Sequence, residues 1–591
     1  MPESHIATIL DAIFAHEQSQ GDAIACSLLG RDEAVEQQCT FAELARGVRQ
    51  LSTALREQVP SGERAMLALP FGIDYLQAFL ACLHAGIIAV PAYSPRTNRQ
   101  DDRFTAMMSD CQPIAVLCDK NDRDPIAAQS TDVRIIALQE LRGEKSPNVI
   151  CLAKPDSVAY LQYTSGSTST PKGVMITNSN LVANNRAIRD AFGNRTDSVG
   201  VMWIPMFHDM GLVSGLQCLF VGYRNVIFAT NHFIARPGMW FRAISKYGGT
   251  VTGGPNFAFQ VCVDRIADDE LDGLDLSSWK VAYNGAEPIR ASTLDRFTER
   301  FGRIGFRSTM HFPCYGLAES TLFVSGGPAG FESPRLRLDR RSLESGLVLF
   351  SDEGGTGDTT ELVSSGRPDP ESDVQIVAPE TSRVTADDQI GEILIDSPSV
   401  AKGYWNDPQA TASDFGVTIP DHPGARYMRS GDLGFLHDGE LFVTGRHKDL
   451  VIVNGRNVFP QDIEAEFEAV VSASVKNGTA VFGLEVDACE QVVVVAETSR
   501  GLYRDARHGD VEQLTNDIDT FRQTVWNNMN LHIWEIVFLR PGTFPRTTSG
   551  KIRRRACRNH FLAKSLDVIV RVPFKGDPEI VSPKNTREVP T

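Results

Sequence analysis

Residues 163–174 read YTSGSTSTPKGV, a segment of hydroxyl side chains, glycines and one lysine. Apolar runs flank it, VAYLQY before and GVMIT after, and Asn178 is expected to cap the helix that follows. The segment is therefore predicted to be a loop between two buried strands. It suits a phosphate group, because glycine permits close backbone approach, hydroxyls donate hydrogen bonds and Lys172 adds a positive charge.

The loop is not a Walker A motif. That motif needs Gly-Lys-Ser/Thr at the start of a helix, whereas here Lys172 precedes Gly173. The alternative interpretation is a flexible polar hairpin, which is the usual meaning of one short Gly/Ser loop. The position between two apolar strands favours anion binding over that alternative.

The composition is that of an ordinary globular protein too long for one hydrophobic core. The chain has 591 residues, 42% of them hydrophobic and 22% charged, so it is expected to divide into several lobes. The formal net charge of -16 opposes binding to nucleic acid or to anionic membranes. One basic cluster, KIRRRACR at 551–558, is interpreted mostly as a solvated helix face.

Cysteine usage and hydropathy indicate a cytoplasmic protein without a transmembrane segment. The eleven cysteines include no C-x-x-C pair and no zinc-ligand spacing, which is typical of reduced thiols. The N-terminus carries early acidic residues and predicts a short amphipathic helix, not a signal peptide. The longest apolar segment, YLQAFLACLHAGIIAVPAY at 75–93, is interrupted by polar residues, glycine and proline, and predicts a buried helix that runs into a strand.

The order of apolar runs predicts an α/β fold. Short β-branched runs alternate with helical patterns through the first two thirds of the chain, which favours α/β layers with largely parallel sheets. Turn-separated strands over about 362–445 predict a small β-barrel-like subdomain. A small α+β domain is expected over 447–571, and residues 572–591 are expected to be a flexible tail.

Seven further motifs follow the loop in a fixed order. They are WIPMFHDMGL at 203–212, NGAEP at 284–288, YGLAES at 315–320, GEILIDSPSVAKGYW at 391–405, SGDLG at 430–434, GRHKDLVIVNGRNVFPQDIE at 445–464 and PRTTSGKIRR at 545–554. With the loop, these motifs make the sequence resemble the adenylate-forming superfamily over nearly the whole chain. Three of them, FHDMGL, YGLAES and GRNVFPQDIE, look most like those of fatty acyl-AMP ligases.

The resemblance implies an N-terminal adenylation domain over 1–446 and a mobile C-terminal lid domain over 447–571, with the hinge at Lys448. The activity it implies is attack of a fatty acid carboxylate on the α-phosphate of ATP, with Mg2+. Glu319 would be the metal ligand, a hard oxygen donor for a hard cation. The loop would hold the β- and γ-phosphates through Thr164, Ser165, Gly166, Ser167, Thr168, Thr170 and Lys172.

The same resemblance assigns the nucleoside side of the site. Asn284, Gly285 and Ala286 would line the adenine, and Tyr315, followed by Gly316, would stack on it. Asp432 would accept hydrogen bonds from the ribose hydroxyls, with help from Arg446. Without the resemblance, Asp432 would be interpreted as an ordinary turn aspartate.

The acyl side of the site is expected around His208. A histidine in the apolar setting MWIPMFHDMGL is more often a core residue, but the resemblance gives it a catalytic, substrate-side role. Asp209, Gly211 and Gly285 would also contact the substrate, and small residues in GLVSGLQCLF suit an alkyl tunnel, which gains about 0.8 kcal/mol per buried methylene. Lys551 would be the catalytic lysine that stabilises the transition state at the α-phosphate.

The expected acceptor is the phosphopantetheine thiol of an acyl carrier protein. The chain has no attachment motif of its own, since KSLD near Ser565 lacks an aspartate before the serine, so the carrier must act in trans. A segment at about 330–360 resembles an insertion that hinders the use of CoA. A fatty acyl-CoA synthetase is the nearest alternative, and a nonenzymatic nucleotide-binding scaffold is the second.

Overall fold

The strands predicted to flank the loop form one edge of a six-stranded sheet. The computed structural model describes residues 6–95, 101–129, 133–141, 150–164, 171–351, 359–453, 456–486, 489–508, 512–529, 531–547, 551–574 and 579–580. The sheet has the order β6-β5-β3-β4-β7-β8 and is parallel except between β7 and β8. Its strands are β3 (Arg64–Ala68), β4 (Ile88–Pro91), β5 (Ala115–Cys118), β6 (Arg134–Ala137), β7 (Val158–Tyr163) and β8 (Gly173–Thr177).

A second sheet has nine strands in the order β17-β14-β13-β12-β11-β9-β10-β1-β2. It is parallel from β1 to β13, and β2, β14 and β17 add antiparallel edges. Its strands are β1 (Ile24–Leu29), β2 (Val35–Thr40), β9 (Val199–Met202), β10 (Arg224–Phe228), β11 (Val251–Gly254), β12 (Val281–Asn284), β13 (His311–Gly316), β14 (Phe323–Gly326) and β17 (Arg367–Pro368).

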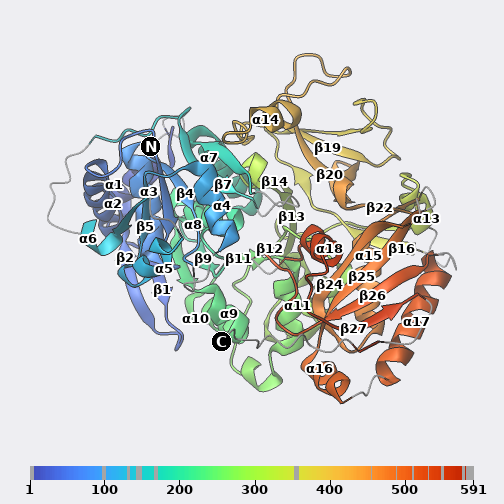
Figure 1. The fold of residues 1–591 in the computed structure, drawn as a ribbon. Helices are drawn as coiled ribbons and strands as arrows, with labels where there is room; N and C mark the ends of the chain where they lie inside the picture. The colour runs from blue at the N-terminus through green and yellow to red at the C-terminus, as the bar shows by residue number, and fades with distance from the viewer. Residues whose placement is uncertain are drawn as a thin grey trace, which may run out of the picture.

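Helices cover both sheets, and one apolar core contains residues of both (Figure 1). The helices of this part are α1 (Ile9–Gln20), α2 (Phe41–Arg56), α3 (Ile73–Ala85), α4 (Asp102–Cys111), α5 (Arg123–Ala127), α6 (Leu138–Leu141), α7 (Asn178–Phe192), α8 (Asp209–Val221), α9 (Thr230–Ala235), α10 (Gly238–Tyr247), α11 (Asn256–Arg265) and α12 (Ala291–Phe301). The predicted α/β class is therefore confirmed.

Local signals explain where these helices begin and end. α3 ends at Gly86, whose φ of 70° is the left-handed conformation that glycine adopts readily, and β4 follows, so the predicted helix that runs into a strand is confirmed. α7 differs from the prediction by one residue. Thr177 is its N-cap and Asn178 its first residue, because the Thr177 hydroxyl and the Asn180 amide form a reciprocal capping box.

The third part is a four-stranded antiparallel sheet with a small hairpin beside it. The sheet contains β18 (Asp373–Val377), β19 (Gly391–Asp396), β20 (Met428–His437) and β21 (Glu440–Arg446), with α14 (Pro408–Asp414) nearby. The hairpin is formed by β15 (Arg335–Asp339), α13 (Arg340–Glu344) and β16 (Thr359–Val363), in the region predicted to be an insertion. The four-stranded sheet thus runs from Asp373 to Arg446.

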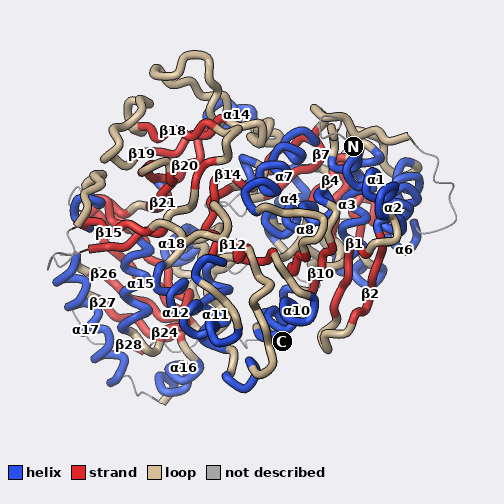
Figure 2. The backbone as a smooth tube through the Cα atoms, turned by 180° about the vertical axis from the view of Figure 1, so that it is seen from behind, coloured by secondary structure: helices blue, strands red, loops and turns tan. Residues whose placement is uncertain are grey.

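The C-terminal part has its own five-stranded sheet and core. Both Figure 1 and Figure 2 show it beside α11 and away from α1 and α2. Its elements are β22 (Val451–Val453), β23 (Arg456–Val458), α15 (Pro460–Val470), β24 (Ser474–Val486), β25 (Cys489–Thr498), α16 (Arg500–Arg507), α17 (Glu512–Met529), β26 (Ile533–Leu539), α18 (Arg554–Leu562), β27 (Val568–Pro573) and β28 (Glu579–Ile580).

The expected flexible tail begins inside this sheet. β27 runs to Pro573, and β28 pairs with it, because the apolar alternation of VIVRVP continues past residue 571 and offers an edge for pairing. Residues 575–578 and 581–591 lie outside the described residues. Among the helices that the structure describes, none is long and apolar enough to cross a membrane.

Candidate active site

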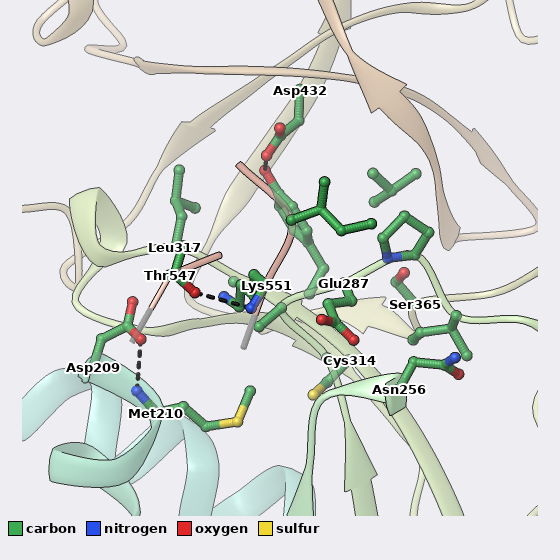
Figure 3. Close-up of a pocket in the computed structure, with 18 of the residues that line it drawn as sticks. Asp209, Met210, Asn256, Glu287, Cys314, Leu317, Ser365, Asp432, Thr547 and Lys551 are labelled. Atoms are coloured by element: carbon green, nitrogen blue, oxygen red, sulfur yellow. Dashed lines mark hydrogen bonds between the residues drawn. The ribbon is translucent and has the colours of Figure 1, made fainter. Parts of the chain in front are cut away.

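A cavity of about 1180 Å³ lies where the large sheets, the four-stranded sheet and the C-terminal part meet. Figure 3 shows its centre, with Lys551 between Asp209 on one side and Glu287 on the other. Residues from strands, loops and helices hundreds of positions apart therefore line one cavity. That arrangement suits a reaction between two bound molecules.

The phosphate loop is described only at its base. Thr164 and Pro171 line the cavity, and the Thr164 N–H donates to the Lys172 carbonyl at 3.3 Å. The Lys172 amine lies 3.6 Å from an Asp407 carboxylate oxygen and 4.5 Å from the Tyr404 ring centroid, in cation–π geometry. The predicted phosphate contacts Ser165, Gly166, Ser167, Thr168 and Thr170 lie outside the described residues.

Glu319 is held beside that lysine. The Tyr404 hydroxyl donates to Glu319 Oε1 at 3.1 Å, and the Ala401 N–H donates to the Glu319 carbonyl at 2.9 Å. Burial raises the pKa of Glu319, and Arg446 acts in the opposite direction. Among the described residues no cluster of three or more His, Cys, Asp or Glu side chains forms a metal site. Glu319 therefore offers one carboxylate, and further ligands to a cation would come from bound phosphates and water.

Tyr315, Asp432 and Arg446 form a connected set at one end of the cavity. The Tyr315 hydroxyl donates to Asp432 Oδ2 at 2.7 Å, and Arg446 Nε donates to Asp432 Oδ1 at 2.9 Å. Asp432 is 5% exposed, and its charge raises the pKa of Arg446. The pair arises because β20 and β21 place Asp432 opposite Arg446.

The loop after β12 lies next to this set. Gly285, Ala286, Tyr315 and Gly316 line the cavity. Gly316 is needed for packing, since a Cβ there would lie 1.8 Å from the Leu322 carbonyl oxygen. Asn284 differs from the expectation: it does not line the cavity, is fully buried, and its Nδ2 donates to Oδ1 of the lining residue Asn256 at 3.3 Å. The strand alternation turns its side chain away from the ligand space.

His208 and Asp209 lie at the start of α8, on the opposite side. His208 Nδ1 lies 2.6 Å from Asp209 Oδ1, and the Met210 N–H donates to the same carboxylate oxygen at 2.7 Å. Burial alone would raise the pKa of Asp209, but the charges of His208 and Lys551 lower it further than burial raises it. Gly211 does not line the cavity; a Cβ there would lie 2.1 Å from the Pro205 carbonyl oxygen, so this glycine permits close packing of the helix on the preceding loop.

Lys551 lines the cavity from its position just before α18. Its backbone N–H donates to Thr547 Oγ1 at 2.9 Å, and the Thr547 N–H donates to its carbonyl at 2.8 Å. Burial lowers the pKa of Lys551, whereas Asp209 and Glu287 raise it. Glu287 was missed in the sequence, although it follows Ala286 in the quoted NGAEP motif and was the one acidic residue there.

Ion pairs hold the C-terminal part in this position. Arg340 of α13 donates to Asp462 at 3.1 Å, and Arg290 lies 3.7 Å from Glu468, which is 4% exposed. The predicted hinge residue Lys448 lies in a short 3-10 helix, His447–Asp449, between β21 and β22. The last strand of the large part and the first strand of the C-terminal part thus meet at one short turn.

Comparisons with known proteins agree with this geometry. The family model described as AMP-binding enzyme matches residues 14–405, and one described as Disco-interacting protein 2-like, AMP domain, matches residues 448–571. The chain is 36% identical over 580 residues to the medium-chain-fatty-acid--[acyl-carrier-protein] ligase JamA of Moorena producens, covering 96% of this chain and 97% of that protein. It is 35% identical over 534 residues to the long-chain-fatty-acid--AMP ligase FadD26 of Mycobacterium tuberculosis, covering 86% and 89%.

A solved structure extends the comparison to three dimensions. The crystal structure of a fatty acyl-adenylate ligase from L. pneumophila in complex with acyl adenylate and pyrophosphate has a TM-score of 0.74 and 33% sequence identity, covering 97% of this chain and 99% of that one. The similarity therefore spans both the large part and the smaller C-terminal part.

Proposed function

The chain belongs to the AMP-binding enzyme family, and from this premise we propose that it activates a medium- or long-chain fatty acid with ATP and loads it on an acyl carrier protein. The acid becomes an acyl-adenylate with release of pyrophosphate, and the acyl group then passes to the phosphopantetheine thiol of the carrier. The observation that carries the proposal is that Lys551 shares one cavity with His208 and Asp209 on one side and with Tyr315 and Asp432 on the other.

The first step is a displacement at the α-phosphorus. A carboxylate oxygen bonds to phosphorus, the bond from phosphorus to the bridging oxygen breaks, and pyrophosphate leaves with the bonding electrons. Lys551 is placed to neutralise the charge that develops on the α-phosphate oxygens, and its neighbours Asp209 and Glu287 hold the ammonium in position. His208 borders the carboxylate. Asp432 and Arg446 fix the ribose, so the two reactants stay aligned.

Mg2+ is part of the proposal. Glu319 fits it as a single half-buried carboxylate held by Tyr404, whose ring Lys172 also contacts, in a site whose other oxygen ligands would come from phosphate and water. When bound, the cation would neutralise part of the negative charge of the phosphates. The role of the protein is to keep Glu319 oriented, which the Tyr404 hydroxyl does.

The second step needs another position of the C-terminal domain. We propose a division into an adenylation domain at 1–446 and a lid at 447–571, with rotation at Lys448 between the two half-reactions. In the described position, the lid contributes Lys551 to the cavity. Rotation would withdraw Lys551 and bring the 449–458 segment to the adenylate, where the carrier thiol attacks the carbonyl carbon and AMP leaves.

Packing of the β15–α13–β16 hairpin supports a carrier protein over CoA as acceptor. Leu338 and Leu343 of this hairpin form one buried cluster with Phe435 and Phe442 of the four-stranded sheet and with Phe459 of the lid. The hairpin therefore contacts both parts whose relative movement the second step requires. A hairpin that contacts both parts would restrict movement of the lid into the position that an enzyme needs in order to use CoA.

Thioester formation with two acceptors tests the choice. The purified chain is given ATP and dodecanoate, with either CoA or a phosphopantetheinylated carrier protein, and the products are separated by mass spectrometry. We expect acyl carrier and little acyl-CoA. Efficient acyl-CoA formation would assign the chain to the acyl-CoA synthetases.

We also propose that the reaction takes place in the cytoplasm and that the enzyme has neither a nucleic acid nor an integral membrane partner.

A further inference from the structure

The far end of the acyl side of the cavity carries an unpaired amide. Asn225 of β10 lines the cavity and is 0% exposed. Neither its Nδ2 nor its Oδ1 has a hydrogen-bond partner among the residues that the structure describes. Buried side-chain amides are nearly always hydrogen bonded. An amide with both ends unpaired on the wall of a substrate cavity therefore points to a ligand group.

The neighbours of Asn225 leave room for such a group. Gly200 of β9 stands opposite Asn225 in the strand register. A Cβ on Gly200 would lie 2.7 Å from Cys218 Sγ and 3.4 Å from Asn225 Oδ1. Any larger residue at this position would fill the space over the amide. Cys218 and Tyr223 complete the wall.

Other polar groups nearby are already engaged. The Gln217 amide, in its hydrogen-bonded orientation, donates to the Asn185 carbonyl at 3.0 Å and accepts from the Arg189 N–H at 3.1 Å. The Tyr223 hydroxyl accepts from Asn194 Nδ2 at 3.3 Å. Gln217 and the Tyr223 hydroxyl therefore have protein partners, whereas the Asn225 amide, which lines the cavity, has none among the described residues.

The position of Asn225 fixes which part of a substrate reaches it. The reaction centre lies at Asp209, at the start of α8, and Cys218 is nine residues further along the same helix. At a rise of 1.5 Å per residue this places Cys218 about 13 Å from the reaction centre. An extended chain with carbon–carbon bonds near 1.5 Å needs roughly ten carbons to span that distance.

We propose that the preferred acyl substrate is a medium-length chain with an uncharged hydrogen-bonding group, such as a hydroxyl, near its far end, and that Asn225 selects it. The inference rests on the proposed function and narrows its substrate class. An amide both donates and accepts, and a hydroxyl does the same. The described residues that line this end, from β9, β10 and the second half of α8, are uncharged, so an ionised end group would have no counter-charge there.

Selectivity follows from the cost of leaving the amide unpaired. A plain alkyl chain that reaches Asn225 removes water from both amide atoms and offers nothing in return. Sites that hydrogen-bond a substrate hydroxyl discriminate strongly against the analogue that lacks it. The ω-hydroxy acid of matching length should therefore react faster than the alkyl acid.

Acid-dependent ATP–pyrophosphate exchange tests this with a homologous series of straight-chain acids, each paired with its ω-hydroxy counterpart. For the length that reaches Asn225, we expect wild-type kcat/KM to favour the hydroxy acid by about tenfold or more. Asn225→Leu should reverse the preference. Asn178→Ala removes another buried amide, whose partners Lys154 and Ser157 do not line the cavity, and should keep the wild-type ratio.

The outcomes separate the inference from the function on which it rests. Exchange with alkyl acids but no preference for any hydroxy acid in the wild type would overturn the inference and leave the proposed function intact. No exchange with any acid, in folded protein, would overturn both. The wild-type ratio decides the matter even if Asn225→Leu does not fold.

Discussion

At the scale of single residues, Lys551 carries the proposed chemistry. Lys551→Ala removes the ammonium that faces the α-phosphate, so single-turnover adenylate formation is expected to fall about 100-fold or more, the effect of losing one preorganised donor to a developing charge. ATP binding should stay close to wild type, because Asp432, Arg446 and Glu319 remain. Rapid-quench measurement of acyl-adenylate checks this. Wild-type adenylate formation in the variant would remove Lys551 from the mechanism.

The protonation of Lys551 gives the reaction an alkaline limit. Burial lowers the pKa of Lys551, so the ammonium loses its proton at a lower pH than an ordinary lysine, whose pKa is about 10.4. The rate of exchange is expected to decline as the pH rises through this lowered pKa. Lys551→Arg keeps its charge at such pH values, and its residual activity should lack the decline. A pH profile that is the same in both proteins would contradict the assignment.

Asp432 organises the nucleoside end. Asp432→Ala removes the acceptor for Tyr315 and Arg446 and leaves two donors without it. We expect KM for ATP to rise about 10- to 100-fold, which corresponds to the roughly 1–3 kcal/mol of a lost charged acceptor. Asp197→Ala removes an exposed carboxylate distant from Asp432 in the sequence and is the control, for which KM should stay unchanged. An unchanged KM in Asp432→Ala would mean that the ribose binds elsewhere.

At the scale of secondary-structure elements, the β15–α13–β16 hairpin sets the acceptor. Leu343→Ala removes about 2–5 kcal/mol of packing from the cluster shared with Phe459. We expect this loosening of the lid to increase acyl-CoA formation several-fold while pyrophosphate exchange changes little. Arg341→Ala, on the exposed side of α13, should have no effect. Acyl-CoA formation that stays at the wild-type level in Leu343→Ala would show that the hairpin does not exclude CoA.

The positions of the strands could be predicted from the sequence, but the directions of several side chains could not. The strands were readable, because β-branched runs and turn residues are local signals, and so β7 and β8 on either side of the loop could be predicted. Lys551 was assigned through the resemblance of the motif order to the adenylate-forming superfamily. Side-chain direction is not local. Asn284 was expected against the adenine, but its side chain donates to Asn256. Glu287 could have been found as the acidic residue of the NGAEP motif, whereas Asn225 could be found only once strands distant in sequence lay side by side.

At the scale of the whole molecule, the proposed second step requires a lid that turns at Lys448. Lys448→Pro fixes φ at the turn between β21 and β22. We expect exchange to persist, because the described position already contains Lys551 in the cavity, while transfer to the carrier falls at least tenfold. Lys448→Ala keeps the rotation free and should transfer normally. Normal transfer in Lys448→Pro would place the hinge elsewhere.

The most direct measurement of the central claim is ATP–pyrophosphate exchange by the purified full-length chain, with and without fatty acid. The cavity joins a nucleotide side, an acyl side and Lys551, so exchange should depend on ATP and on an acid that fits the acyl side. Exchange should be absent without acid and lost in Lys551→Ala. Folded protein that catalyses no exchange with any fatty acid would contradict the proposed function.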